Sequence, residues 1–381
     1  MADVRRADER RADERPADER PTVPFVRVSG SHREVGRQVG AATAEVLRTA
    51  VDFDAALPAG VDRAGRLALA ARYREATLAA TPWLVEEIDG AAEGAGVDPL
   101  ALFAASIEEI WTIRPSQVGI GGLGANRPVD GRCSDLVAAP PATADGHLWV
   151  AHNNDLDPSS EPNVVAIEWR VPGEPVVFSL GMGPWISAGW NDAGLSLTGN
   201  ELAPNDERVG VPRLLMVREQ LTARTLDAAV EMALRPDRAS SYNTVFAHRD
   251  GRVVNVEGSA TDAELVRPGD RGTLVHTNHY ACPRMLQYEG DPAYAVKSAV
   301  RYERAGALLA GATADGPGAV TPERLRGWLA DHATEPAICR HERSGVDGSV
   351  TVFWCLADVT AGEISYGLGR PCQPGEERYR F

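Results

Sequence analysis

The chain has 381 residues, of which 54 are acidic and 39 basic, so its formal net charge is −15 at pH 7. That charge repels phosphate backbones and anionic lipid surfaces, which argues against nucleic acid or a membrane as a partner. No run of 18 apolar residues and no signal-peptide core is present, so no membrane span is expected. The five cysteines form no C-x-x-C pair, so neither a zinc ribbon nor a disulfide framework is expected. We expect a reducing, cytoplasmic environment.

The first 21 residues are low in complexity, because the tetrad ADER occurs three times, starting at Ala7, Ala12 and Ala17. This segment offers almost nothing apolar to bury, which is typical of a solvated and disordered charged tail. The expected domain organisation is therefore a tail over residues 1–21 and a single folded domain over residues 22–381.

The segment from Phe25 to Trp111 is predicted to be mostly helical. Residues 25–28 alternate like a strand, and the helical pattern that follows carries Gly36 and Gly40 on its packing side. Further helices are predicted at residues 61–82, 83–95 and 98–113.

The second part of the chain changes character after Cys133. Short β-type runs separated by Gly, Pro, Asn and Asp predict strands at 147–153, 163–171, 174–181, 185–190 and 194–200. Later segments predict helices at 212–221 and 225–234, a hairpin at 242–258, a strand at 272–280, helices from about 293 and 321, and strands at 349–358 and 362–369. Strands in two batches with helices between and around them favour two stacked sheets covered by helices.

The stretch VDGRCSDLVAAP places Cys133 between a turn and a predicted strand. Free cysteine is often buried for packing alone, but a thiol nucleophile fits the same place. One scheme uses a histidine on another segment as the base. In a second scheme the chain is cut before the nucleophile, and the freed α-amino group, with an ordinary pKa of about 8, is the base.

Three downstream stretches supply partners for such a site. Asp155 ends AHNND, and a hairpin would bring it beside Cys133 to bind the α-ammonium group. Asn200 ends GLSLTGN, and Asn278 lies within HTNHY at the end of a predicted strand. Asparagine donates hydrogen bonds without carrying charge, as an oxyanion hole requires, although each asparagine taken singly is more typical of a turn.

At these residues the sequence resembles a known family. VSGSHREVGRQVG, DGRCSD, AHNND, HTNHY and the run from ICRH to GRPC follow the order and spacing of segments in the acyl-coenzyme A:6-aminopenicillanic acid acyltransferase family. This family is also described as peptidase family C45 and belongs to the N-terminal-nucleophile hydrolases, near the choloylglycine hydrolases. The resemblance runs from about Phe25 to Phe381. It implies an α+β fold, a four-layer αββα sandwich.

The resemblance also implies residue roles. Cys133 would be the nucleophile and the new N-terminus after self-cleavage between Arg132 and Cys133, with Asp155 as its charge partner. Asn278 would be an oxyanion or amino-group ligand, and Asn200 a second oxyanion donor. The chain departs from the family at Arg132, because many members cleave directly after a glycine.

Three further features bear on these roles. His152 lies where choloylglycine hydrolases have an arginine. SIEEIW, residues 106–111, replaces an N-A-R-T-E-like stretch. The triplet CSD in place of CTT looks more like the β-alanyl-amine hydrolase branch than the penicillin branch.

The expected activity is hydrolysis of a linear C–N amide bond in a small N-acyl amine or amide, through a Cys133 thioester, with acyl transfer as a secondary activity. No resident cofactor is expected, and a coenzyme A thioester is a candidate co-substrate. The two self-cleaved fragments are expected to stay associated. Hydrolysis is favoured over transfer because no basic cluster is visible to hold a coenzyme A phosphate. Two alternatives stay open: an uncut cysteine protease with His152 or His279 as base, and a non-catalytic binding module.

The remaining histidines and cysteines have no function assigned from the sequence. His276 and His279 are three residues apart on a predicted strand and would face opposite sides, which disfavours a shared metal. No metal site is expected. His332 and His341 have no visible partner, and the other cysteines are interpreted as structural: Cys282, Cys339, Cys355 and Cys372.

Overall fold

The computed structural model describes residues 22–54, 57, 62–110, 133–314, 316–341 and 348–381. The predicted tail and Arg132, on one side of the predicted cleavage site, lie outside these ranges. Within the described residues, every helix is too short or too polar to traverse a bilayer.

The described strands form two sheets, one of eight strands and one of six. The larger sheet has the order β1(Phe25–Ser29)-β4(Val165–Arg170)-β5(Val177–Met182)-β6(Trp185–Asn191)-β7(Leu195–Asn200)-β8(Asn243–His248)-β9(Val253–Gly258)-β10(Ala263–Val266). The smaller sheet has the order β11(Thr273–His276)-β2(Cys133–Ala138)-β3(Trp149–Leu156)-β12(Val350–Asp358)-β13(Glu363–Leu368)-β14(Glu377–Arg380). Only β1 and β4 pair in parallel among the described strands.

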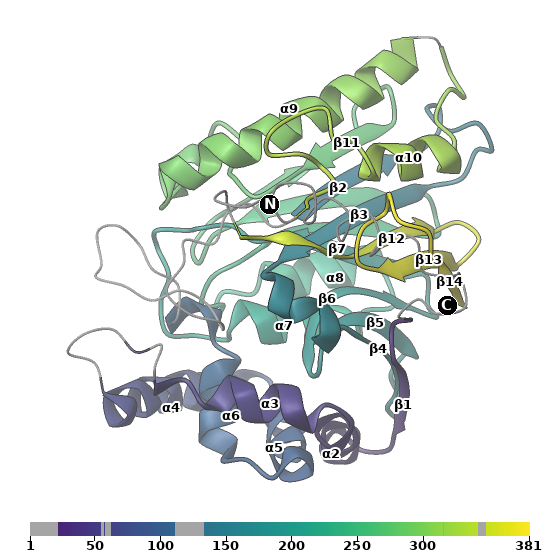
Figure 1. Cartoon of the computed structure of the whole chain (residues 1–381). Helices are drawn as coiled ribbons and strands as arrows, with labels where there is room; N and C mark the ends of the chain where they lie inside the picture. Colours follow the sequence, from purple (N-terminus) through teal and green to yellow (C-terminus); the bar gives the residue numbers. More distant parts are fainter. Residues whose placement is uncertain (1–21, 55–56, 58–61, 111–132, 315, 342–347) are drawn as a thin grey trace, which may run out of the picture.

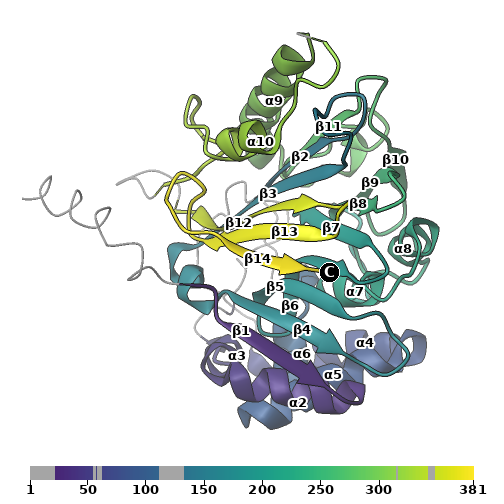
Figure 2. The same cartoon turned by 90° about the vertical axis from the view of Figure 1, so that its right-hand side faces the viewer.

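The two sheets pack face to face and are covered by helices on their outer faces. One apolar cluster joins the sheets, with Phe178 and Trp190 from the larger and Val150 and Phe353 from the smaller. A second cluster packs α2(His32–Ala42), α7(Arg213–Gln220) and α8(Leu226–Ala233) on the larger sheet. A third packs α9(Pro292–Ala314) and α10(Pro322–Leu329) on the smaller sheet. Figures 1 and 2 show this order of layers, which confirms the predicted αββα sandwich.

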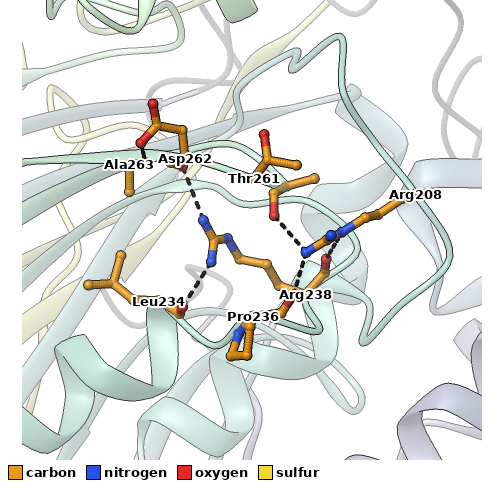
Figure 3. Close-up of a pocket in the computed structure, with 8 residues that line it drawn as sticks. Arg208, Leu234, Pro236, Arg238, Thr261, Asp262 and Ala263 are labelled. Carbon is orange, nitrogen blue, oxygen red and sulfur yellow. Dashed lines mark hydrogen bonds between the residues drawn. The ribbon is translucent and has the colours of Figure 1, made fainter.

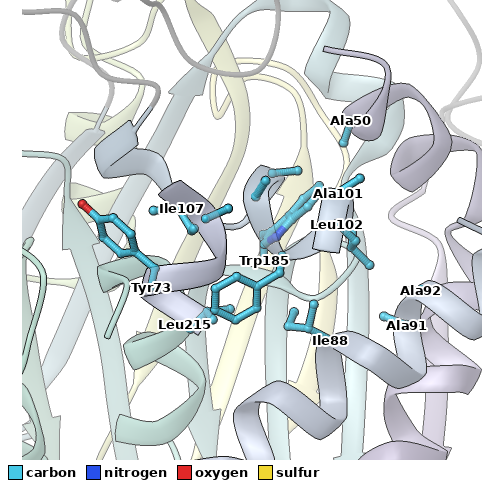
Figure 4. Packing of buried hydrophobic residues seen from close by; sticks show 14 of the residues in the cluster. Ala50, Tyr73, Ile88, Ala91, Ala92, Ala101, Leu102, Ile107, Trp185 and Leu215 are labelled. Carbon is cyan, nitrogen blue, oxygen red and sulfur yellow. The ribbon is translucent and has the colours of Figure 1, made fainter. Parts of the chain in front are cut away.

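The described residues between Ala44 and Ala105 form a helical assembly beside the larger sheet. It contains α3(Ala44–Val51), α4(Arg63–Ala80), α5(Pro82–Ala95) and α6(Pro99–Ala105). Their apolar side chains surround Trp185 of β6 (Figure 4), and the Trp185 indole N–H donates to Ser106 Oγ at 2.9 Å. The N-terminal segment is thereby attached to a strand that follows Cys133 in the chain.

α2 and α5 pack closely against each other, and glycine makes this contact possible. A Cβ atom at Gly36 would lie 2.1 Å from the Glu87 carbonyl oxygen, and one at Gly40 would lie 2.0 Å from that of Ala91. Gly90 and Gly94 of α5 are equally crowded against α2. The prediction that Gly36 and Gly40 lie on the packing side is therefore confirmed.

Several predicted boundaries were wrong. The helical pattern after Gly30 is two helices, because Thr43 leaves helical geometry at φ −119° and ψ 26° while its hydroxyl donates to the Val39 carbonyl. The helix predicted from residue 98 ends at Ala105, where Ser106 Oγ bonds back to Leu102 O. The strand predicted over 272–280 covers only Thr273–His276. The short edge strands β10 and β14 were not predicted, because four residues carry too little alternation.

Candidate active site

Cys133 is the first residue of β2, which pairs antiparallel with β3. Cys133 lies opposite Asn154, and Asp135 lies opposite His152. Because side chains alternate along a strand, Cys133 and Asp135 point to the same face as Val137, which belongs to the core between the sheets. The thiol is therefore held at one end of the space between the sheets, and its residue is 5% exposed.

Asn278 contacts the backbone nitrogen of Cys133. The Cys133 N–H donates to Asn278 Oδ1 at 2.8 Å, and a guanidinium N–H of Arg301 donates to the same oxygen at 3.0 Å. Asn278 Nδ2 donates to the Glu201 carbonyl at 3.1 Å, and the Asn278 backbone N–H donates to Ser298 Oγ at 2.6 Å. Two donors at Oδ1 fix the orientation of this amide. Of the two roles expected for Asn278, this contact is consistent with a ligand of the Cys133 nitrogen, and both roles stay predictions.

Arg301 is a buried contact of Cys133 that sequence reasoning missed. It lies on α9 and is fully buried. One guanidinium nitrogen donates to the Cys133 carbonyl at 2.5 Å and to Ser134 Oγ at 2.8 Å. Burial lowers the pKa of Arg301, and the nearby Asp155 carboxylate opposes that effect. Arg301 thus places a positive charge in contact with the first two residues of β2.

Asp155 lies one residue beyond the partner of Cys133 and points to the opposite face from Asn154. It is fully buried, and its Oδ1 accepts a hydrogen bond of 2.6 Å from the Thr351 hydroxyl on β12. Burial raises the pKa of Asp155, while the charges of Arg301 and Arg340 and the Thr351 hydrogen bond oppose the rise. Hairpin pairing thus places Asp155 beside the start of β2, but its carboxylate points to the face opposite the Cys133 side chain. There the Thr351 hydroxyl and the charge of Arg340, which sequence reasoning also missed, act on it. Its role as charge partner of the α-ammonium group stays a prediction.

The environment of the Cys133 thiol keeps it protonated. Burial raises its pKa strongly, and the negative charges of Asp155 and Asp135 raise it further, against opposing contributions from Arg301 and a backbone hydrogen bond of Asp155. Asn154 Nδ2 donates weakly to the sulfur at 3.7 Å. Because the thiolate is the nucleophilic form, the thiol needs a base that removes its proton during attack.

Asn200 ends β7 on the larger sheet and is fully buried. Its Oδ1 accepts from Asn243 Nδ2 at 3.0 Å and lies 3.1 Å from His276 Nδ1. Its Nδ2 has no hydrogen-bond partner among the described residues. The next residue, Glu201, contacts Asn278 through its carbonyl. Asn200 is thus close to the Cys133 cluster and has a buried donor available, as an oxyanion donor requires.

The two candidate histidine bases have different surroundings. His152 lies on the same face of β3 as Asn154, its Nδ1 is 2.9 Å from Asp135 Oδ1, and its Nε2 has no partner in the described part of the chain. His279 Nδ1 lies 2.9 Å from Ser298 Oγ, and burial lowers the pKa of His279 to about 4. His276 contacts Glu257 through Nε2 at 2.8 Å.

A separate pocket of about 500 Å³ opens between the turn after α8 and the β9–β10 turn. Arg208 and Arg238 cross it, and both bond to backbone carbonyls of its own walls (Figure 3). Neither Cys133 nor its hydrogen-bond partners line this pocket.

Comparison with known proteins gives a family match and distant structural neighbours. The model of the family described as acyl-coenzyme A:6-aminopenicillanic acid acyl-transferase matches residues 142–373. Two variants of conjugated bile acid hydrolase from Clostridium perfringens are 10% and 12% identical, with TM-scores of 0.43 and 0.44, over 65% of this chain and 97% of theirs. Penicillin V acylase from Agrobacterium tumefaciens is 12% identical, with a TM-score of 0.36, over 65% of this chain and 86% of its own.

Proposed function

Because the chain belongs to the acyl-coenzyme A:6-aminopenicillanic acid acyl-transferase family, we propose that it cleaves amides by acyl transfer to Cys133. The substrate is a small N-acyl amine or amide, and the acyl group is passed from a Cys133 thioester to water or to an amine. The observation that carries this proposal is the hydrogen bond of 2.8 Å from the Cys133 nitrogen to Asn278 Oδ1, at the start of a strand.

The proposed base is the α-amino group freed by self-cleavage between Arg132 and Cys133. The free amine takes the thiol proton as sulfur attacks the substrate carbonyl, so a C–S bond forms and the carbonyl oxygen becomes an oxyanion. When the tetrahedral intermediate collapses, the C–N bond breaks and the amine base returns the proton to the leaving nitrogen. Asn278 Oδ1 keeps the amine lone pair directed toward the thiol, and burial, which raises the pKa of Cys133, favours a base next to the sulfur.

The proposed oxyanion donors are Asn200 Nδ2 and Asn154 Nδ2. Asn200 Nδ2 is buried without a partner among the described residues, and Asn154 Nδ2 already points at the sulfur at 3.7 Å. Both are uncharged donors, so they stabilise charge as it develops without binding an anion in the resting enzyme.

Hydrolysis is proposed as the main outcome, with transfer secondary. The net charge of −15 disfavours an anionic acyl-coenzyme A donor. The direct test incubates the enzyme with N-acyl amines, penicillins and acyl-coenzyme A esters, followed by acid quenching and mass spectrometry of the Cys133-containing peptide. We expect acylation from amides in the wild type and in Cys282→Ser, but none in Cys133→Ala. Acylation by coenzyme A esters alone, with transfer to amines and no amide hydrolysis, would reverse the proposed order.

A second candidate is an uncut thiol enzyme that uses His152 as base. It is favoured by one observation, the pairing of His152 Nδ1 with Asp135 at 2.9 Å while Nε2 has no partner among the described residues. The two candidates differ in a measurable way. This candidate requires an intact active chain and a complete loss of turnover in His152→Gln, whereas the α-amine scheme requires a Cys133 N-terminus in the active species.

A further inference from the structure

Four metal-ligating side chains from three separate segments converge on the outer side of the smaller sheet. His332 follows α10, Cys339 and His341 lie in the run toward β12, and Cys372 lies between β13 and β14. Their ligand atoms all lie within 4.8 Å of one another. The sulfurs of Cys339 and Cys372 are 3.6 Å apart, and His341 Nε2 is 3.7 Å and 3.3 Å from them. The Nε2 atoms of the two histidines are 3.1 Å apart.

We propose that these four residues bind a zinc ion. Zinc takes thiolate sulfur at about 2.3 Å and imidazole nitrogen at about 2.0–2.1 Å in a tetrahedron, which separates the ligand atoms by about 3.3–3.8 Å. The four distances given above range from 3.1 to 3.7 Å. Two thiolates with two imidazoles form a Cys2His2 set, which selects zinc among common ions because carboxylate and water suit magnesium or calcium instead.

The same residues do not form a disulfide site in this geometry. A disulfide bond joins sulfurs at about 2.05 Å, whereas these sulfurs are 3.6 Å apart and both cysteines are free. A disulfide would also give no reason for His341 Nε2 to lie within 3.7 Å of both sulfurs, or for His332 Nε2 to lie 3.1 Å from His341 Nε2. A central cation explains all four orientations together.

The zinc site is structural, because four protein ligands leave no open position for a substrate. The ion would link three segments: His332 after α10, Cys339 and His341 before β12, and Cys372 between β13 and β14. Arg340 lies between two of the ligands. Its backbone N–H donates to Thr351 Oγ1 at 3.0 Å, and its carbonyl accepts from Thr351 N at 3.2 Å. Thr351 in turn donates to Asp155. A bound zinc ion would therefore also fix the position of the groups around Asp155. Any effect of this on catalysis rests on the proposed function.

The test measures metal in protein produced without a polyhistidine tag and purified without chelators. Inductively coupled plasma mass spectrometry should find about one zinc per chain in the wild type and in Cys282→Ser, a matched cysteine variant outside the cluster. Cys372→Ser and His332→Gln should lose most of this zinc. X-ray absorption at the zinc edge of the wild type should find two sulfur ligands at about 2.3 Å and two nitrogen ligands at about 2.0–2.1 Å.

Three results would overturn the proposal. One is a wild-type protein that binds no zinc after exposure to zinc chloride. Another is a mass two hydrogens lower that maps to a Cys339–Cys372 disulfide. The third is unchanged zinc content in both Cys372→Ser and His332→Gln. If Cys372→Ser fails to fold, the zinc content of His332→Gln, a change at an exposed residue, and the X-ray absorption spectrum of the wild type still test whether zinc is bound by these residues. None of these readouts depends on enzymatic activity, so the zinc site and the proposed reaction are tested separately.

Discussion

At the scale of single residues, two asparagines near Cys133 differ in their hydrogen bonding. Both polar ends of the Asn278 amide are bonded, Oδ1 to Cys133 and Nδ2 to the Glu201 carbonyl. The Nδ2 group of Asn200 is buried without a partner among the described residues. A buried unpaired donor costs a fold about 1–3 kcal/mol. In the proposed reaction a developing oxyanion would remove that cost, so the donor of Asn200 would favour the transition state over the resting enzyme.

Asn200→Ala should therefore lower kcat by about 100- to 1000-fold, as expected for removal of one oxyanion donor. The matched control is Asn205→Ala, an exposed asparagine five residues later whose side chain donates to the Gln287 carbonyl. Circular dichroism and self-cleavage should be unchanged in both variants. A folded Asn200→Ala enzyme with wild-type turnover would remove Asn200 from the site.

His279 makes stability depend on pH in a defined direction. Burial lowers the pKa of His279 from its ordinary value of 6.5 to about 4. The unfolded chain therefore binds a proton at this residue before the folded protein does. The contribution of neutral His279 to the free energy of unfolding is therefore fully present above pH 6.5 and is lost progressively as the pH falls toward 4. In urea denaturation, His279→Asn should lose less stability over this interval than the wild type, because its amide can still hydrogen-bond to Ser298 Oγ and does not titrate.

His147→Asn is a control of opposite sign. A hydrogen bond to Asp358 raises the pKa of His147, so its contribution is present at low pH and is lost as the pH rises through the folded-state pKa. The His147 variant should therefore lose more stability on acidification than the wild type does. If both variants shift the pH profile the same way, the assigned environment of His279 is wrong.

At the scale of elements, the α2–α5 contact depends on the absence of side chains at its centre. Gly40→Ala places a Cβ atom against the Ala91 carbonyl and should destabilise the protein by about 1–3 kcal/mol, the usual cost of overpacking. Gly306→Ala in α9 is the matched control, because a Cβ there meets nothing within 4 Å. Helix propensity predicts that this second change stabilises by about 0.5–1 kcal/mol. Thermal unfolding should give a lower melting temperature for Gly40→Ala and a higher one for Gly306→Ala than for the wild type. Equal shifts of the melting temperature in the two variants would contradict the close packing of α2 and α5.

Sequence patterns predicted the elements and the layers well, because alternation and helical spacing are local properties. Cys133 and Asp155 could be placed together because a hairpin joins neighbouring strands. Arg301 could not be identified, because either of the two arginines on α9 looks like an exposed residue until the helix is docked. The zinc ligands were missed for a related reason. Thirty residues separate His341 from Cys372, and no spacing rule links them before β12, β13 and β14 pair.

At the scale of the whole molecule, the segments on the two sides of the predicted cleavage site form one body. β1 lies before that site, yet it is the edge strand of the larger sheet and pairs in parallel with β4 over Phe25 to Ser29. α2 packs on the outer face of the same sheet, and the helices around Trp185 contribute a separate apolar cluster. Cutting one peptide bond removes none of these contacts. The cleaved protein should therefore keep the fold of the intact chain.

Wild-type protein should accordingly contain two fragments, residues 1–132 and 133–381, that separate only under denaturing conditions. Intact mass spectrometry under denaturing conditions should find both fragments, and size-exclusion chromatography under native conditions should give one particle that contains both. Cys133→Ala should remain a single chain, because the thiol that attacks the preceding carbonyl is absent, and it should elute at the same volume as the wild type. Wild-type protein that stays full length after incubation at neutral pH would reject the α-amine as base. Fragments that separate without denaturant would instead show that the β1–β4 pairing and the helix contacts are too weak to hold them.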